Sequence, residues 1–257
     1  MDLQLQGKTA FVAASTGGLG RAIAEALGAE GANVVVTGRR GERAAEIAAD
    51  VPSAIGIELD VTDAASRAAA LDKATASFGP IDILVINGPG PKPGTAAEAT
   101  ASDIADSYER LVAPGHDLVS RVLPGMRQRG SGRIVAVGSS GIVSPIPNLA
   151  GSNTGRAALA GYLKTLSTEV AVDGVTVNLV LPGRIATDRV AQLDAAQAER
   201  QGIDPVEAQR RSEQTIPAGR YGDPSEFGAA VAFLCGAQAA YITGVALRVD
   251  GGLVRTL

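Results

Sequence analysis

Residues 8–27 read KTAFVAASTGGLGRAIAEAL, and this stretch decides the fold. Its apolar start, Thr9–Ala14, is typical of a buried strand, whereas its Ala-rich end opens a segment of helical period, Gly18–Glu30. The glycines between them form a turn through which the backbone can approach a pyrophosphate at the positive end of the helix. The stretch therefore predicts the first strand and helix of an α/β domain that binds a nucleotide.

The rest of the chain repeats this alternation of strand and helix. Further strands are expected at Asn33–Thr37, Ala54–Glu58, Ile81–Asn87, Gly132–Gly138, Val175–Leu181 and Ala246–Val249. Further helices are expected at Gly41–Asp50, Ala64–Phe78, Ser102–Arg129, Ser152–Val172 and Pro224–Cys235. Continuous apolar strands are typical of a parallel sheet covered on both faces, and repeated βαβ units imply right-handed crossovers. We predict a single Rossmann-type domain over residues 1–257, a doubly wound parallel sheet of about seven strands with helices on both faces.

A polar segment, Thr187–Thr215, separates the last two predicted strands. It is rich in Ala and Gln and too long for an ordinary connection in a compact domain. We expect it to be helical and to lie over a binding site as a lid.

Composition narrows the classes of partner. The 257 residues include 3% aromatics, and the net charge of −4 is carried by scattered side chains with no basic stripe, so neither nucleic acid nor an anionic membrane surface is expected. The single cysteine, Cys235, excludes an internal disulfide and favours a reducing, cytoplasmic location. The chain starts with a polar segment rather than a signal peptide, and no membrane span is predicted. No metal site is predicted.

The glycine turn has the spacing Ala14-x-x-x-Gly18-x-Gly20. This differs from the commoner GxGxxG fingerprint. It resembles the TGxxxGxG turn of the short-chain dehydrogenase/reductase family, except that Ala14 replaces the first glycine. Taken alone, the turn is also compatible with an ordinary tight connection between a strand and a helix.

The end of the second strand bears on the choice of cofactor. Proteins that prefer NAD carry an acidic residue there, whereas a nearby arginine accommodates the 2′-phosphate of NADP. This chain reads VVVTGRR, with Arg39 and Arg40 and no carboxylate, which favours NADP(H) over NAD(H). The alternative is that both arginines are solvated surface residues at the start of a helix.

Other segments extend the family resemblance over the whole chain. Asp60-Val61 resembles the family's adenine contact, Asn87-Gly88 a variant of its NNAG segment, and Pro182-Gly183-x-Ile185-x-Thr187 the segment beside the nicotinamide. The resemblance implies that the cofactor contacts are Ala14, Ser15, Thr16, Gly18, Leu19, Gly20, Arg39, Arg40, Asp60, Val61, Asn87, Gly88, Arg156, Pro182, Gly183, Ile185 and Thr187.

The catalytic half departs from the family pattern. The family uses a Ser, a Tyr, a Lys four residues after the Tyr, and an Asn that anchors a relay water. Ser139 occupies the serine position, but Ser152 stands where Tyr is expected, Arg156 where Lys is expected, and Leu111 at the usual Asn. We nevertheless take Ser139, Ser152 and Arg156 as the candidate catalytic residues.

These replacements change the chemistry available. A serine hydroxyl is a far weaker acid than a phenol, and an arginine stays protonated, so neither can supply a proton readily. Arg156 can still hold ribose hydroxyls and stabilise developing negative charge. Three functions stay open: hydride transfer with the proton taken from water or substrate, NADP(H) binding without turnover in a regulatory or scaffold protein, and non-redox chemistry on a small molecule.

Other polar residues are weaker candidates. His116 has a suitable pKa for proton transfer, but a lone histidine on such a helix more often packs or lies in an interface. Tyr162 and Lys164 lie too far along the helix from Ser152 to replace it. The tips of Arg184 and Tyr221 cannot be placed from sequence. The family resemblance also implies a homotetramer or dimer built on the two longest predicted helices.

Overall fold

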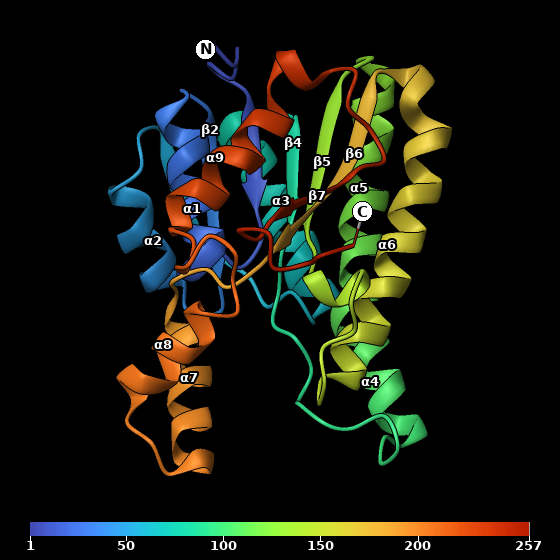
Figure 1. The fold of residues 1–257 in the computed structure, drawn as a ribbon. Helices are drawn as coiled ribbons and strands as arrows, with labels where there is room; N and C mark the ends of the chain where they lie inside the picture. Colours follow the sequence, from blue (N-terminus) through green and yellow to red (C-terminus); the bar gives the residue numbers. More distant parts are fainter. Residues whose placement is uncertain (257) are drawn as a thin grey trace.

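The computed structural model describes residues 1–256 and shows one parallel sheet of seven strands, in the order β3-β2-β1-β4-β5-β6-β7 (Figure 1). This confirms the predicted doubly wound α/β fold. The strands are β1 Thr9–Val12, β2 Asn33–Gly38, β3 Ala54–Glu58, β4 Ile83–Ile86, β5 Gly132–Val137, β6 Val175–Pro182 and β7 Ala246–Val249. The order reverses between β1 and β4, and such a switch point is where ligands bind in open α/β sheets.

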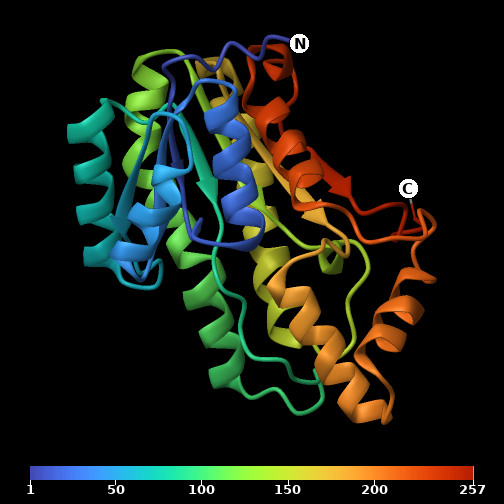
Figure 2. The same ribbon diagram turned by 90° about the vertical axis from the view of Figure 1, so that its left-hand side faces the viewer.

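Two helical layers cover the sheet (Figures 1 and 2). One face packs on α1 Gly18–Ala29, α2 Gly41–Ala49 and α9 Pro224–Cys235, and the other on α3 Ala64–Phe78, α5 Ala113–Gln128 and α6 Ala150–Val170. Alternate residues of β1 point to opposite faces of the sheet. Phe11 lies in the core beneath α3, α5 and α6, Val12 lies in the core beneath α1, α2 and α9, and both are fully buried. Burial on both faces explains why the strands read as continuous apolar runs.

One predicted helix is wrong in extent. Ser102–Arg129 was expected to be continuous, but the structure has α4 Ala101–Leu111 and α5 Ala113–Gln128, with Val112 between them. Pro114 lies in the first turn of α5, where its missing N–H costs nothing; within a continuous helix it would remove a hydrogen bond and clash with the preceding turn. The predicted strands Thr9–Ala14 and Ile81–Asn87 are also shorter in the structure.

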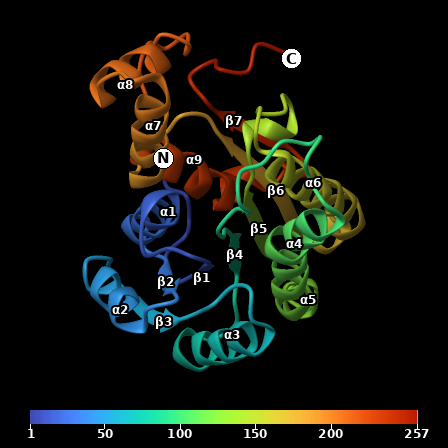
Figure 3. The ribbon, with the colours of Figure 1, turned by 90° about the horizontal axis from the view of Figure 1, so that it is seen from below.

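The segment between β6 and the last helix is helical, as predicted. It forms α7 Asp188–Gln201 and α8 Pro205–Glu213, which lie beyond the carboxyl ends of the strands, opposite α4 (Figures 1 and 3). No helix within residues 1–256 has the length and apolar character needed to cross a bilayer.

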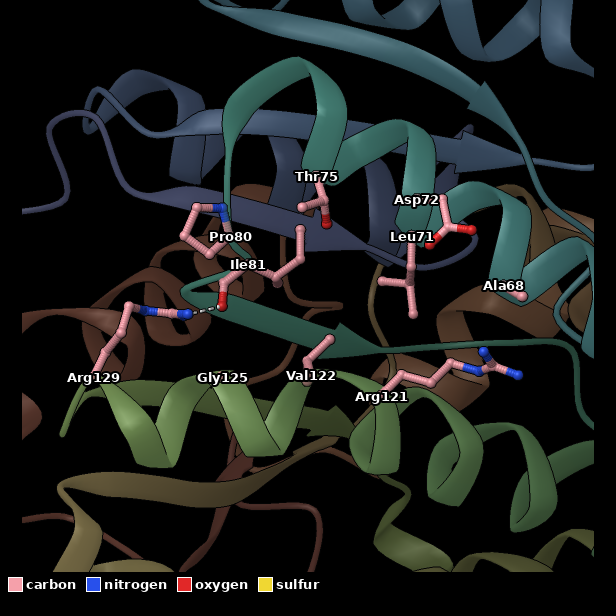
Figure 4. Close-up of a pocket in the computed structure, with 10 residues that line it drawn as sticks. All are labelled: Ala68, Leu71, Asp72, Thr75, Pro80, Ile81, Arg121, Val122, Gly125 and Arg129. Carbon is pink, nitrogen blue, oxygen red and sulfur yellow. Dashed lines mark hydrogen bonds between the residues drawn. The ribbon is translucent and has the colours of Figure 1, made fainter.

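A surface groove of about 370 Å³ runs between α3 and α5 (Figure 4). At one end Arg129 donates a hydrogen bond from Nη2 to the carbonyl of Ile81, at 2.8 Å. None of the residues that line this groove belongs to the predicted site, which lies at the carboxyl ends of the strands.

Candidate active site

The turn after β1 has the backbone geometry of a glycine turn, although its first position is alanine. Ala14 has φ 49°, in the left-handed region that glycine favours. Its amide donates to Thr37 Oγ1 at 3.1 Å, and its carbonyl accepts from Asn87 Nδ2 at 3.1 Å. Three strands therefore hold the turn, which explains how a residue with a Cβ is kept in this conformation.

Gly20 shows why the turn needs glycine at its last position. A Cβ placed there would lie 2.3 Å from the carbonyl oxygen of Ala14 and 2.8 Å from the Cα of Ser15. The side chain of Ser15 faces inward, because its hydroxyl donates to Val12 and accepts from the Thr37 amide, both at 2.8 Å. Of the predicted cofactor contacts in the turn, Ser15 thus offers its backbone rather than its side chain.

The start of α1 is left open for an anion. Its N-cap, Gly17, has no side chain to accept hydrogen bonds from the first amides. A Cβ on Gly18 would lie 3.7 Å from Thr187 Cγ2, so the turn meets the segment after β6. Leu19 is partly buried and packs against the core beneath α1, α2 and α9. Thr16 lies against Gly38 at the end of β2. These contacts gather residues that lie far apart in the chain.

Arg39 and Arg40 are exposed at the end of β2 and line a hollow of about 730 Å³. Arg43 and Glu58 line the same hollow and were missed from the sequence. Arg43 lies in the first turn of α2, three residues after the Arg39-Arg40 pair on which the sequence prediction was based. Glu58 is the last residue of the neighbouring strand, β3. Three glutamates, Glu42, Glu46 and Glu58, line the hollow beside the three arginines. Arg43 pairs with Glu46 at 2.8 Å, whereas Arg39 and Arg40 form no ion pair within residues 1–256 and can donate to a phosphate group.

Asp60 and Val61 follow β3, the strand beside β2. Thr62 donates to the Asp60 carboxylate from its amide at 2.9 Å and its hydroxyl at 2.7 Å. These hydrogen bonds lower the pKa of Asp60, and Arg39 adds a smaller effect in the same direction. A Cβ on Gly88 would lie 3.4 Å from Val61 Cγ2, so the ends of β3 and β4 meet here.

The segment after β6 is held by backbone contacts. Gly183 donates its amide to the Val249 carbonyl at 2.9 Å, and a Cβ on Gly183 would lie 2.6 Å from the Cα of Asp250. Pro182 ends β6, Ile185 is buried, and Thr187 precedes α7 without capping it through its side chain. These backbone contacts hold the segment in place, and Thr187 at its end lies beside the glycine turn.

Ser139 and Arg156 come together at the end of β5. Arg156 donates from Nη1 to the carbonyls of Val137 at 2.7 Å and Gly138 at 3.1 Å, the two residues before Ser139. Ser139 has extended backbone, and its Oγ accepts from the Gly141 amide at 3.0 Å, which leaves its hydroxyl proton free to donate. Burial lowers the pKa of Arg156 from its usual value, because the charged form loses hydration.

Ser152 lies one turn before Arg156 on α6, so the two share a face of that helix. Its neighbour Asn153 accepts from the Ile146 amide at 3.3 Å and donates to the Ile146 carbonyl at 3.0 Å, which ties the loop after Ser139 to α6. This role of Asn153 was missed, because nothing in the local sequence distinguishes it from a helix-surface amide.

The other candidates have structural partners. Leu111 is buried, and its Cδ1 would lie 2.8 Å from a Cβ on Gly155, so it packs α4 against α6. The His116 ring lies against Tyr162, with centroids 5.4 Å apart. Lys164 donates from Nζ to the Gly244 carbonyl at 2.9 Å. The contact with Tyr162 agrees with the packing role expected for His116, and the ammonium of Lys164 is engaged in a hydrogen bond.

Arg184 and Tyr221 meet at a buried carboxylate. Tyr221 donates its hydroxyl to Asp194 Oδ2 at 2.8 Å, and Arg184 Nη1 lies 3.2 Å from Asp194 Oδ1. Burial raises the pKa of Tyr221, and the adjacent carboxylate adds to this rise. Asp194 of α7 is thereby joined to Arg184, which precedes α7, and to Tyr221, which follows α8. The Tyr221 hydroxyl is used in this hydrogen bond.

Comparison with known proteins agrees with this architecture. A family model described as enoyl-(acyl carrier protein) reductase matches residues 13–254. The chain is 38% identical to the 3-oxoacyl-(acyl-carrier-protein) reductase FabG of Escherichia coli K12 over 255 residues, which cover 98% of this chain and 99% of the relative.

Two solved structures show the same fold. L-sorbose reductase from Gluconobacter frateurii, complexed with NADPH and L-sorbose, has a TM-score of 0.94 and 32% identity, and each chain is fully covered. The actinorhodin polyketide ketoreductase with NADPH has a TM-score of 0.91 and 32% identity, over 97% of this chain and 98% of the other. The chain therefore belongs to the short-chain dehydrogenase/reductase family of oxidoreductases.

Proposed function

We propose that this protein is an NADP(H)-dependent oxidoreductase that transfers a hydride to or from a small carbonyl, alcohol or imine through an atypical site. The observation that carries the proposal is that the open glycine turn after β1 and the donors Ser139 and Arg156 at the end of β5 lie along one edge of the sheet, on either side of β4 and its switch point. The complexes of relatives with NADPH support this choice of cofactor.

The residues present fit the dinucleotide. Gly20 keeps clear a space that a Cβ would fill, and the first amides of α1 have no side-chain cap, so a pyrophosphate fits there. Arg39 and Arg40 provide charge-assisted donors for a 2′-phosphate, and the Arg156 guanidinium provides N–H groups for the nicotinamide ribose. When bound, NADPH would supply the hydride.

The chain's own groups would orient and polarise the substrate. The Ser139 hydroxyl donates to the substrate oxygen, Ser152 offers a second hydroxyl, and Arg156 stabilises negative charge as it develops. None of these three groups is a general acid at neutral pH, so the proton comes from water or the substrate. Since general acid catalysis contributes ~10²–10⁴-fold, turnover without it is slow but not abolished.

The insertion and the family resemblance give two further proposals. Helices α7 and α8 form a lid over the site, hinged where Asp194 joins Arg184 and Tyr221. The protein assembles as a homotetramer or dimer through the face of α4, α5 and α6, where Ile104 and Tyr108 of α4 are exposed. Light scattering coupled to size-exclusion chromatography measures the oligomeric state directly.

Titration with NADPH and NADH, followed by reduced-nicotinamide fluorescence, tests the nucleotide site. We expect tight NADPH binding and weak NADH binding, and we expect Arg39→Asp to weaken NADPH binding much more than NADH binding. Lys73→Asp, which makes the same charge change on the exposed face of α3, serves as the control. An equal loss for both nucleotides in Arg39→Asp would refute the 2′-phosphate contact.

Turnover tests the catalytic site. With carbonyl and imine substrates, Ser139→Ala and Arg156→Ala should reduce NADPH oxidation more than they reduce NADPH binding. Unchanged turnover in both variants would refute the proposed roles. Tight NADPH binding with no turnover over a broad substrate panel would favour the alternative of a regulatory or scaffold protein.

A further inference from the structure

Ser139 stands at the start of the loop that joins β5 to α6. The first part of this loop is one short turn, Ser140–Ile142, in which the Gly141 amide donates to Ser139 Oγ at 3.0 Å. After this turn the loop runs over the surface, where residues 143–145 and 147–148 are exposed and Ile146 is half-buried. Exposed loops open easily, so the position of the Ser139 hydroxyl depends on contacts that fix the loop from outside.

The side-chain amide of Asn153, in the first turn of α6, fixes this loop at Ile146. Asn153 Oδ1 accepts from the Ile146 amide at 3.3 Å, and Nδ2 donates to the Ile146 carbonyl at 3.0 Å. Ile146 lies between Pro145 and Pro147, which have no N–H, so its amide is the one backbone donor among these three residues. One side chain therefore engages both backbone groups at the middle of the loop, as a neighbouring strand would.

The same side chain lies against Gly141. A Cβ built on Gly141 would lie 2.5 Å from Asn153 Oδ1 and 3.2 Å from Ser139 Oγ. Gly141 is buried and has no positive φ, so glycine is needed here for space rather than for backbone conformation. Gly141 thus stands between Asn153 and Ser139: it packs on the Asn153 amide and donates to the Ser139 hydroxyl oxygen.

The start of α6 gives Asn153 a fixed support. Ala150, the first residue of α6, donates its amide to the Gly94 carbonyl at 3.1 Å. A Cβ on Gly155 would lie 2.9 Å from the carbonyl oxygen of Ser107, so α6 also packs closely on α4. Asn153 therefore connects a well-anchored helix to a loop that has few contacts of its own.

We propose that Asn153 is a positioning residue, which holds the Ser139 hydroxyl in place for the substrate oxygen by fixing Gly141 and Ile146. Ser139 contacts the substrate only in the proposed function, so the inference rests on that function. Asn153 acts through the loop and needs no contact with substrate or cofactor. A small displacement of a group that orients the substrate can lower a rate about 100-fold, so the clamp has a measurable effect on turnover.

A double-mutant cycle in kcat, with ethyl acetoacetate as the carbonyl probe, tests whether Asn153 acts through Ser139. Asn153→Ala should lower kcat about 10- to 100-fold without weakening NADPH binding, and Thr154→Ala, at the exposed next position of α6, should change neither. In the Ser139→Ala background, Asn153→Ala should have almost no further effect on kcat, because the group that it positions is gone. An equal loss in both backgrounds, or no loss in either, would overturn the inference.

Asn153→Asp keeps the size of the side chain and removes its donor. The ionised carboxylate has only acceptors and repels the Ile146 carbonyl, whereas the protonated acid regains one donor. The kcat of Asn153→Asp relative to the unaltered protein should therefore be low at neutral pH and rise as the pH falls toward about 4. A ratio that does not change with pH would overturn the clamp.

Amide hydrogen exchange tests the clamp without turnover, so that the two proposals can fail separately. Exchange at Gly141 and Ile146 should accelerate in Asn153→Ala and stay unchanged in Thr154→Ala, and unchanged exchange in both variants would overturn the inference. Accelerated exchange in Asn153→Ala, together with no turnover of any substrate by the unaltered protein, would support the clamp and contradict hydride transfer.

Discussion

Replacing Ala14 by glycine should stabilise this protein, against the usual effect of adding a glycine. Ala14 adopts φ 49°, where its Cβ approaches the backbone, and this conformation is held by hydrogen bonds to Thr37 and Asn87. Glycine adopts the same φ without strain. Both hydrogen bonds involve the backbone of residue 14, so the substitution leaves them in place.

The magnitude follows from two opposing terms. An L-residue in the left-handed region costs about 1–2 kcal/mol, and the substitution relieves this cost. Glycine gives back about 0.5–1 kcal/mol through the greater freedom of the unfolded chain. The net gain therefore lies between about 0 and 1.5 kcal/mol and is centred at about 0.75 kcal/mol, which corresponds to a rise in Tm of about 2–3 °C for a chain of this length.

Denaturant unfolding and thermal melts of the unaltered protein and Ala14→Gly measure this gain. Ala13→Gly is the matched control, because Ala13 is the adjacent residue, is fully buried and has no positive φ. The control should lose about 1–2 kcal/mol through lost burial and added backbone freedom. If Ala14→Gly loses as much stability as Ala13→Gly, the argument from backbone strain is wrong.

Three further predictions concern the turn, the lid and pH. Gly20→Ala should cost about 1–3 kcal/mol and abolish NADPH binding, because its Cβ would lie 2.3 Å from a backbone oxygen. Gly17→Ala, with no atom within 4 Å of its Cβ, should lose only about 0.5 kcal/mol, because alanine is a poorer N-cap of α1 than glycine. Tyr221→Phe leaves a buried oxygen of Asp194 without a donor, so amide hydrogen exchange in α7 and α8 should accelerate. Hydrogen bonds from a neighbouring arginine lower the pKa of Glu226 from 4.5 to about 2, so its contribution to stability is present above about pH 4.5 and disappears as the pH falls through about 2. Melts of Glu226→Gln and the unaltered protein should therefore differ at pH 7 and converge at low pH.

Each of these predictions can fail on a specific result. Equal stability of the Gly20→Ala and Gly17→Ala proteins would contradict the steric argument. Unchanged exchange in α7 and α8 of Tyr221→Phe, with Tyr241→Phe as an exposed control, would show that the buried cluster does not hold the lid. A stability difference for Glu226→Gln that persists at low pH would mean that the Glu226 charge is not its source.

Much of the fold could be predicted because its signals are local. The apolar runs and the helical periods place all seven strands and most helices, and the glycine turn is recognised from adjacent residues. The break between α4 and α5 was readable from Pro114 but was obscured by apolar periodicity on both sides. The assignment of Ser152 and Arg156 to the family's tyrosine and lysine positions rests on sequence spacing and stays a prediction.

Side-chain environments were decided only by the tertiary structure. The sequence by itself predicted Arg156 at the family's lysine position, but only the folded chain brings its guanidinium to the carbonyls of Val137 and Gly138, 19 and 18 positions away. The same holds for the meeting of Asp194 with Tyr221, 27 positions apart. The periodicity of apolar residues predicts which face of a helix or strand is buried. The hydrogen-bond partner of a polar side chain depends instead on how elements that are distant in the sequence pack together. That is why the sequence determined the fold and the turn, while the structure alone shows that Arg156 reaches the end of β5 and that Tyr221 meets Asp194.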